Sequence, residues 1–213
     1  MTLTIIVLVL LFLLTAYTHR RKAQAAAAAV VSDTKILVCS LRGETPEGFE
    51  DADAGVYAKY YHHVEVAKGR QPDDFIDSID RAGYDVIHLY CELDEEGDLA
   101  GPPGSKLKAG AFFDACRRAD VKLLFIASEN VNENYINMGR QQPKDLALDI
   151  VRTIGRNGES FTSFLGELLG RMSAGKTLAQ AWVEIAPQSE KAQQHMQLPA
   201  TYCSVGRAAV LLP

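Results

Sequence analysis

The sequence contains three short apolar runs, separated by loop and helical patterns. The runs are KILVCS at residues 35–40, YDVIHLYC at 84–91 and VKLLFIA at 121–127. Short apolar runs of this kind are typical of strands that are buried on both faces. Between the first two runs, PDDFIDSIDRAG predicts a helix that Pro72 begins and Gly83 ends. The alternation of strand and helix predicts an α/β fold with a mostly parallel central sheet, covered by helices on both faces.

Weaker patterns predict the remaining elements. We expect further strands at Val64–Ala67, 148–155 and Tyr202–Leu212, and further helices at Leu107–Ala119, Glu159–Ala174 and from Thr177 through Trp182. Polar, glycine- or proline-containing stretches predict loops up to about Asp53, from Asp94 to Ser105, and from Glu129 through Asn137.

Composition excludes several classes of function. With 22 basic and 27 acidic residues and no basic stripe interleaved with aromatic residues, the chain is not expected to bind nucleic acid. The four cysteines are far apart and form no CxxC pair, which argues against a zinc site or a disulfide framework. The adjacent pair His62 and His63 lacks further ligands nearby, and neighbouring side chains in a strand point apart. No cofactor and no metal is expected.

The N-terminal segment from Thr2 to Thr18 contains no charged residue and is long enough to nearly span a bilayer as a helix. A cleaved signal peptide is the competing interpretation. However, the positive residues follow the apolar run, at 20–22, instead of preceding it. This charge pattern favours an uncleaved single-pass anchor with the rest of the chain on the cytoplasmic side. We expect an anchor at 1–20, an alanine-rich linker at 21–33 and one domain at 34–213.

Two C-terminal phrases carry a resemblance to a known family. They are GKTLAQA at residues 175–181, where a predicted helix ends and the next begins, and LPATYCSVG at 198–206. With the order of elements, they make residues 35–213 similar to the CHAT family of caspase-like cysteine peptidases. The resemblance implies a caspase-like, flavodoxin-like three-layer fold.

In that family one strand reads H-L-x-C-H-G, whose second histidine is the general base, and the next reads L-x-x-A-C-E/Q-S/T, whose cysteine is the nucleophile. The corresponding stretches here are HLYCEL at 88–93 and LFIASEN at 124–130. Glu92 therefore replaces the base, Ser128 replaces the nucleophile, and Leu93 replaces the glycine. A serine hydroxyl needs a well-placed base, and a carboxylate with a pKa of about 4.3 is a poor one. Peptide hydrolysis by the family's mechanism is not expected.

The remaining polar residues leave two interpretations open. Glu92 and Ser128, with Glu129 and Asn130, form either a pocket for a peptide or small ligand or a solvated surface without a ligand. His88 and Cys91 are also candidates for ligand binding. They are three residues apart in a strand, so they lie on opposite faces of the sheet and cannot pair directly.

These observations predict a membrane-localised, catalytically inactive scaffold or sensor that recruits a protein partner. The resemblance implies a bacterial defence or regulated-proteolysis module, in which the partner is an active effector or a second copy of the chain. The alternative is a hydrolase that uses Ser128 or Cys91 as nucleophile, with a base from another loop or chain. A nucleotide-binding module is disfavoured, because no GxGxxG or P-loop follows a predicted strand.

Overall fold

The computed structural model describes residues 33–41, 45, 48–153, 158–185 and 200–205. The predicted anchor Thr2–Thr18 and almost all of the predicted linker lie outside these residues. Among the helices that the structure does describe, none has both the length and the apolar character needed to cross a bilayer.

A six-stranded sheet forms the centre of the described chain, in the order β2-β1-β3-β6-β7-β8. Its strands are β1 (Lys35–Ser40), β2 (His63–Ala67), β3 (Val86–Tyr90), β6 (Leu123–Ile126), β7 (Leu148–Thr153) and β8 (Ala200–Val205). The first five strands in this order are parallel, and β8 runs antiparallel to β7. The predicted α/β class with a mostly parallel central sheet is therefore confirmed.

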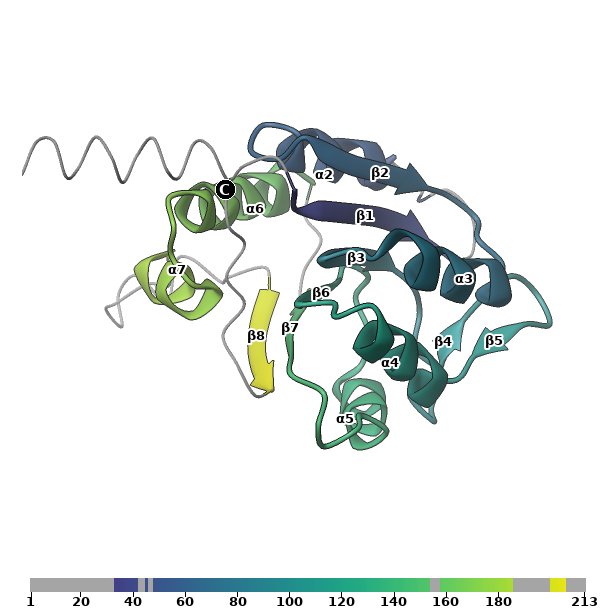
Figure 1. Cartoon of the computed structure of the whole chain (residues 1–213). Helices are drawn as coiled ribbons and strands as arrows, with labels where there is room; N and C mark the ends of the chain where they lie inside the picture. The colour runs from purple at the N-terminus through teal and green to yellow at the C-terminus, as the bar shows by residue number, and fades with distance from the viewer. Residues whose placement is uncertain (1–32, 42–44, 46–47, 154–157, 186–199, 206–213) are drawn as a thin grey trace, which may run out of the picture.

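Helices cover both faces of this sheet, so the structure has three layers (Figure 1). The helices are α2 (Phe49–Tyr57), α3 (Pro72–Ala82), α4 (Ala109–Arg118), α5 (Asn132–Arg140), α6 (Gly158–Ser173) and α7 (Leu178–Ile185). Buried side chains of α3, α4 and α5 share one core with the sheet, and those of α2, α6 and α7 share the other.

The central strand β3 shows why its sequence is apolar throughout. All five of its residues are buried, and successive side chains enter opposite cores. Ile87 and Leu89 pack on the α3 and α4 side, whereas Val86 and Tyr90 pack on the α2 and α6 side. Each fully buried side chain of this size contributes about 1.5–3 kcal/mol relative to exposure, so both helical layers depend on this strand.

Three of the predicted helix ends are confirmed in atomic detail. Pro72 occupies the first turn of α3, and Gly83 follows its last residue with a φ of 62°, in the left-handed region that favours glycine. At the start of α7, Gln180 N donates to Thr177 Oγ1 (3.1 Å) and Thr177 N donates to Gln180 Oε1 (3.0 Å). This reciprocal pair is a capping box, which satisfies two backbone donors that the helix leaves open.

Three predicted loops were wrong. The segments around Asp53 and Asn137 belong to helices α2 and α5, and the stretch 94–105 begins a hairpin formed by β4 (Leu99–Ala100) and β5 (Lys106–Leu107). Helix α4 consequently begins at Ala109 instead of Leu107. Both missed helices carry polar side chains on their inner faces. Glu50 and Asp53 are fully buried in α2, and Asn134 and Asn137 of α5 donate hydrogen bonds to the loop after β3. The helical spacing of apolar residues does not identify a helix that packs through hydrogen bonds of its polar side chains.

The turn at Gly97 lies directly against α5. Gly97 has a φ of 81°, and a Cβ at this position would lie 2.1 Å from Met138 N. Gly104, in the β4–β5 hairpin, has a similar φ of 84° but open space around it. We expect Gly97→Ala to lower the free energy of unfolding by about 3 kcal/mol, because backbone strain adds to a steric clash.

The matched variant Gly104→Ala should cost only about 1 kcal/mol, because it introduces the strain alone. Urea unfolding followed by circular dichroism would measure both changes. Equal losses in the two variants would show that α5 does not hold the turn.

Candidate functional site

The structure places the two strand ends that the sequence analysis singled out side by side. Strands β3 and β6 are parallel neighbours with Leu89 opposite Ile126, and Ala127 N donates to Leu89 O (2.8 Å). Glu92 and Ser128 follow these strands at the carboxyl edge of the sheet, where Glu92 is exposed and Ser128 is half-buried. Open α/β sheets bind their ligands at this edge.

A single side-chain amide bridges the two strand ends. Asn130 Nδ2 lies 3.2 Å from Cys91 O and 3.2 Å from Ser128 O, and Asn130 Oδ1 accepts a hydrogen bond from Leu93 N (2.7 Å). The backbone after β3 and the backbone after β6 are thereby fixed to each other. Asn130, predicted as a ligand-binding residue, directs both ends of its amide to the backbone.

Helix α5 extends this attachment along the whole loop after β3. Two side-chain amides of α5, and that of the residue that follows it, each donate to a loop carbonyl. The bonds run from Asn134 Nδ2 to Leu93 O (2.6 Å), from Asn137 Nδ2 to Glu95 O (2.8 Å), and from the following Gln141 Nε2 to Glu96 O (2.9 Å). These hydrogen bonds explain why α5 is polar and nevertheless packs against the fold as a helix. We call these three residues with Asn130 the amide clamp.

Cys91 and His88 lie on opposite faces of the sheet, as predicted. Cys91 is 3% exposed and packs in the core beneath α3 and α4, whereas the His88 ring stacks on Phe125 in the other core, with 5.3 Å between ring centroids. Burial, together with the nearby Glu92 charge, raises the pKa of the Cys91 thiol far above its ordinary value. The thiol is therefore protonated at neutral pH and is a weak nucleophile.

His88 takes part in a buried polar cluster that sequence reasoning missed. Its Nδ1 lies 3.1 Å from Tyr57 Oη and its Nε2 lies 2.9 Å from Asp53 Oδ2, although this second contact is poorly aligned for a hydrogen bond. The Tyr90 hydroxyl donates to the same Asp53 oxygen, at 2.5 Å. All four side chains are buried, at 4% exposure or less.

The cluster holds helix α2 against β3 and does not face solvent. Asp53 and Tyr57 are four residues apart, which places both on the inner face of α2. This spacing of four residues is the signal in the sequence that indicates a helix with Asp53 and Tyr57 on one face, but the prediction of a loop did not take it into account. His88 is fully buried, so a substrate in solvent cannot reach its ring, and its contacts with Tyr57 and Asp53 pack α2 on β3.

Asp98 anchors the other end of the loop after β3. Its carboxylate is 1% exposed and accepts hydrogen bonds from Lys108 Nζ (2.6 Å), Ala109 N (3.1 Å) and Gln141 Nε2 (3.2 Å). Burial alone would raise the pKa of Asp98, but these donors outweigh it and lower the pKa to about 2. The carboxylate thus joins the loop, the first turn of α4 and the amide clamp.

His62 and His63 lie far from this edge, where β2 begins. They line a cavity of about 440 Å³ together with Glu65 and Arg81. Within the described parts of the chain, no group of three or more histidine, cysteine or acidic side chains could hold a metal ion.

A larger hollow lies between α5 and the sheet, next to the strand ends. Its volume is about 460 Å³, and it is lined by Ile126 of β6, by Ile150 and Arg152 of β7, and by Tyr135 of α5. The Tyr135 hydroxyl also donates to Ser128 O (3.0 Å), so one side chain joins this cavity to the end of β6. The sequence analysis did not identify this cavity, because its walls come from two strands and a helix that it had interpreted as a loop.

Comparison with known proteins gives no family assignment. No family model matches the chain, and neither does any curated relative. Among solved structures, a pyruvate reductase of Chlamydomonas reinhardtii matches 73% of this chain and 40% of its own, at 16% identity and a TM-score of 0.32. A ureidoglycine-glyoxylate aminotransferase from Bacillus subtilis matches 61% of this chain and 31% of its own, at 13% identity and a TM-score of 0.31. Likenesses this weak carry no functional argument.

The Asp98 contacts predict a defined pH dependence of stability. The folded-state pKa of about 2 lies below the ordinary 3.8, so the stabilisation is fully present above about pH 5 and is lost as the pH falls toward 2. The corresponding loss in the free energy of unfolding is about 2 kcal/mol.

Urea unfolding at pH 5 and at pH 2.5, compared between the wild type and Asp98→Asn, isolates this contribution from that of other acids. The variant should be less stable at pH 5 and lose less stability on acidification. Asp77→Asn, an exposed acid on α3, serves as control and should follow the wild type. Parallel pH profiles for the wild type and Asp98→Asn would contradict the assignment.

Proposed function

We propose that the chain is a membrane-anchored, catalytically inactive caspase-like domain that acts as a scaffold or sensor and recruits a protein partner. The observation that carries this proposal is the adjacency of the ends of β3 and β6, bridged by Asn130. CHAT peptidases present their base and nucleophile on two successive strands, and the residues at the corresponding positions here are Glu92 and Ser128.

The chemistry at these positions supports the loss of hydrolysis. A carboxylate open to water is a weaker base toward a hydroxyl than an imidazole is. The nearest thiol, Cys91, is buried and protonated. Of the three histidines in the described residues, His62 and His63 lie at the opposite edge of the sheet, and His88 is enclosed in the α2 core.

The loop that carries Glu92 is built as a fixed surface. The amide clamp attaches it to α5, Asp98 attaches it to α4, and Lys106 forms ion pairs with Asp94 (2.9 Å) and Glu96 (3.4 Å). A fixed polar surface at the former catalytic edge suits recognition of a partner, because little conformational freedom is lost on binding. The partner is an active effector or a second copy of the chain, held at the cytoplasmic side of the membrane by the segment Thr2–Thr18.

Restoring the missing groups tests the correspondence with the peptidase dyad. In the full chain in lipid nanodiscs, the triple variant Glu92→His, Leu93→Gly, Ser128→Cys should react with iodoacetamide at pH 6.5 about tenfold faster at the introduced thiol than Ser128→Cys alone. The physical reason is that a neighbouring imidazole promotes the thiolate. Mass spectrometry of the labelled peptide gives the rate at that site.

The control variant Glu95→His, Ser128→Cys places an imidazole on the same loop but away from the dyad position, and should give no acceleration. Lack of acceleration in the triple variant would overturn the proposed correspondence. Labelling of the wild type by a fluorophosphonate, abolished by Ser128→Ala, would instead establish the hydrolase alternative.

Recruitment predicts a second result. After cross-linking in native membranes, a partner that binds the former catalytic edge should be lost when Glu92 and Glu129 are changed to Arg, because both charges at the surface are reversed. Asp51→Arg on α2 reverses an exposed charge elsewhere and should leave the cross-link intact. Retention of the same cross-linked species in all variants would place the partner on another surface.

A further inference from the structure

Strand β2 forms one edge of the central sheet, at the end opposite β8 (Figure 1). On its inner side it pairs with β1, from His63 to Ala67. Among the backbone hydrogen bonds of the described residues, none joins this strand to a further segment on its outer side. An edge strand of this kind presents a row of N–H and C=O groups with which another strand can pair.

The features by which proteins usually prevent pairing at a sheet edge are absent from β2 itself. The strand HVEVA contains no proline, lysine or arginine, and its register with β1 is continuous over five residue pairs, without a bulge. In addition, Val66 is 38% exposed although it is a large aliphatic residue. Because prolines, basic side chains and bulges are the common means of blocking an edge, β2 is able to accept a second strand.

A hollow of about 440 Å³ follows the outer edge of β2 where the strand begins. The four consecutive residues 62–65 line it, together with Arg81 and Ala82 at the end of α3. Consecutive residues of a strand point to opposite faces of the sheet, so this hollow follows the edge itself and not a single face. There is therefore room beside β2 for the side chains of a second strand.

The sequence of β2 suits pairing with a second copy of itself. A two-fold axis perpendicular to the sheet makes the two strands antiparallel and places one residue opposite its own copy. With Glu65 at the axis, two carboxylates oppose each other, which is destabilising. With Val64 at the axis, His63 of each copy lies opposite Glu65 of the other copy, and His62 lies opposite Val66. Registers centred on His63 or Val66 place no basic side chain opposite an acidic one.

The carboxylate of Glu65 is already oriented by its neighbours. Its Oε2 accepts a hydrogen bond from the Tyr84 hydroxyl (2.5 Å), and its Oε1 lies 3.6 Å from an Arg70 guanidinium nitrogen. An imidazole donates a hydrogen bond to a carboxylate whether it is neutral or protonated, so His63 pairs with Glu65 in both states. The two-fold axis forms this pair twice, and opposite-charge pairs across antiparallel strands are stabilising.

From these observations we propose that two copies of the chain associate through their β2 edges, in antiparallel orientation and with Val64 at the two-fold axis. The two sheets then form one continuous sheet. This contact does not use Glu92 or Ser128, so it leaves the surface at the former catalytic edge free for another partner. A pair of five-residue strands buries less area than a standard interface of about 1,600 Å².

The small size of the contact makes it weak between molecules that diffuse freely. Copies that are confined to one membrane have a higher effective concentration and pair more readily. This step alone rests on the membrane anchor of the proposed function, whereas the open edge and the register do not.

Cysteine cross-linking of the full chain in native membranes tests the edge and the register together. The reagent is a bismaleimide with a two-carbon spacer, and denaturing electrophoresis resolves the dimer. Val64→Cys should cross-link to its own copy, because opposed side chains on paired strands lie about 5 Å apart. Val66→Cys alone should not, because its two copies are about 13 Å apart along the strands. Co-expression of Val66→Cys with His62→Cys should restore the cross-link, since these positions oppose each other.

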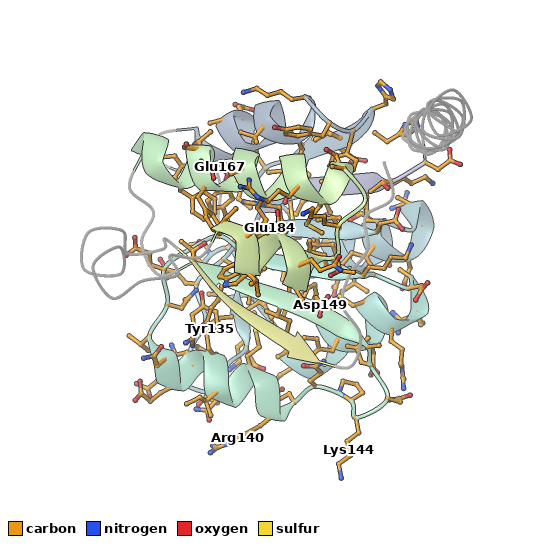
Figure 2. The ribbon with its side chains drawn as sticks, turned by 90° about the vertical axis from the view of Figure 1, so that its left-hand side faces the viewer. Tyr135, Arg140, Lys144, Asp149, Glu167 and Glu184 are labelled. Atoms are coloured by element: carbon orange, nitrogen blue, oxygen red, sulfur yellow. The ribbon has the colours of Figure 1, made fainter. Side chains whose placement is uncertain are left out.

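Two controls accompany these variants. The wild type reports any reaction of the native thiols, of which the three in the described residues are buried. Ile136→Cys reports random collisions, because this side chain is 53% exposed. It lies between Tyr135 and Arg140, which Figure 2 labels on α5, at the end of the molecule away from β2 (Figures 1 and 2). Neither control should give a dimer.

A change of charge tests the pairing of His63 with Glu65. In the Val64→Cys chain, His63→Glu should lower the initial rate of cross-linking about tenfold, because two pairs of carboxylates then oppose each other. His63→Lys keeps a cation opposite Glu65 and should retain the rate. His63 is exposed, and no side chain among the described residues bonds to it, so both substitutions leave the fold intact.

Three results would overturn the proposal. Equal cross-linking of Val64→Cys and Ile136→Cys would remove β2 as the contact, and equal cross-linking of Val64→Cys and Val66→Cys would remove the register. An unchanged rate in His63→Glu would remove the charge pair. Fractionation of the same cells reports on the anchor separately, because recovery of the chain in the soluble fraction contradicts the proposed function and not the pairing.

Discussion

The parallel pairing of β3 with its neighbours is the constraint on which the rest of the structure depends. Because β3 is covered on both faces, each of its side chains must find a partner in one of two cores. The apolar members do so by packing, and His88 does so through Asp53 and Tyr57 of α2. The same pairing brings the segments after β3 and β6 together, so the position of the candidate site follows from the sheet. A polar group in the central strand therefore determines where one of the helices docks.

The predictions from sequence succeeded where apolar periodicity controls the structure. The runs at 35–40, 84–91 and 121–127 all contain strands, and the signals at Pro72, Gly83 and Thr177 mark real helix ends. They failed for α2 and α5, whose inner faces carry Asp53 and the amides of Asn134 and Asn137. Polar side chains at buried positions interrupt the apolar stripe by which a helix is recognised in a sequence. Geometry across the sheet, such as the cavity beside Arg152, depends on which strands become neighbours, which no local pattern specifies.

The loop after β3 shows how hydrogen bonds within the protein keep the carboxyl edge of a sheet ordered. In a working enzyme, hydrogen-bonding side chains at such an edge are directed at the substrate. Here Asn130, Asn134 and Asn137 are directed at the protein's own carbonyl groups, and Asp98 satisfies the first turn of α4. Of the polar residues that suggested a pocket, Asn130 contributes to rigidity. The cavity with mainly apolar walls lies one strand away, on the side of β7.

The burial of the described thiols determines how slowly they react with peroxides. Peroxides attack the thiolate form, and burial raises the pKa of Cys39, Cys91 and Cys116 far above neutrality. A cysteine peptidase exposed to the same oxidant loses its nucleophile to sulfenic acid and further products. At the sheet edge described here, Ser128 carries a hydroxyl, which is inert to peroxide. Ser128 therefore stays chemically unchanged under conditions that inactivate enzymes with a cysteine nucleophile.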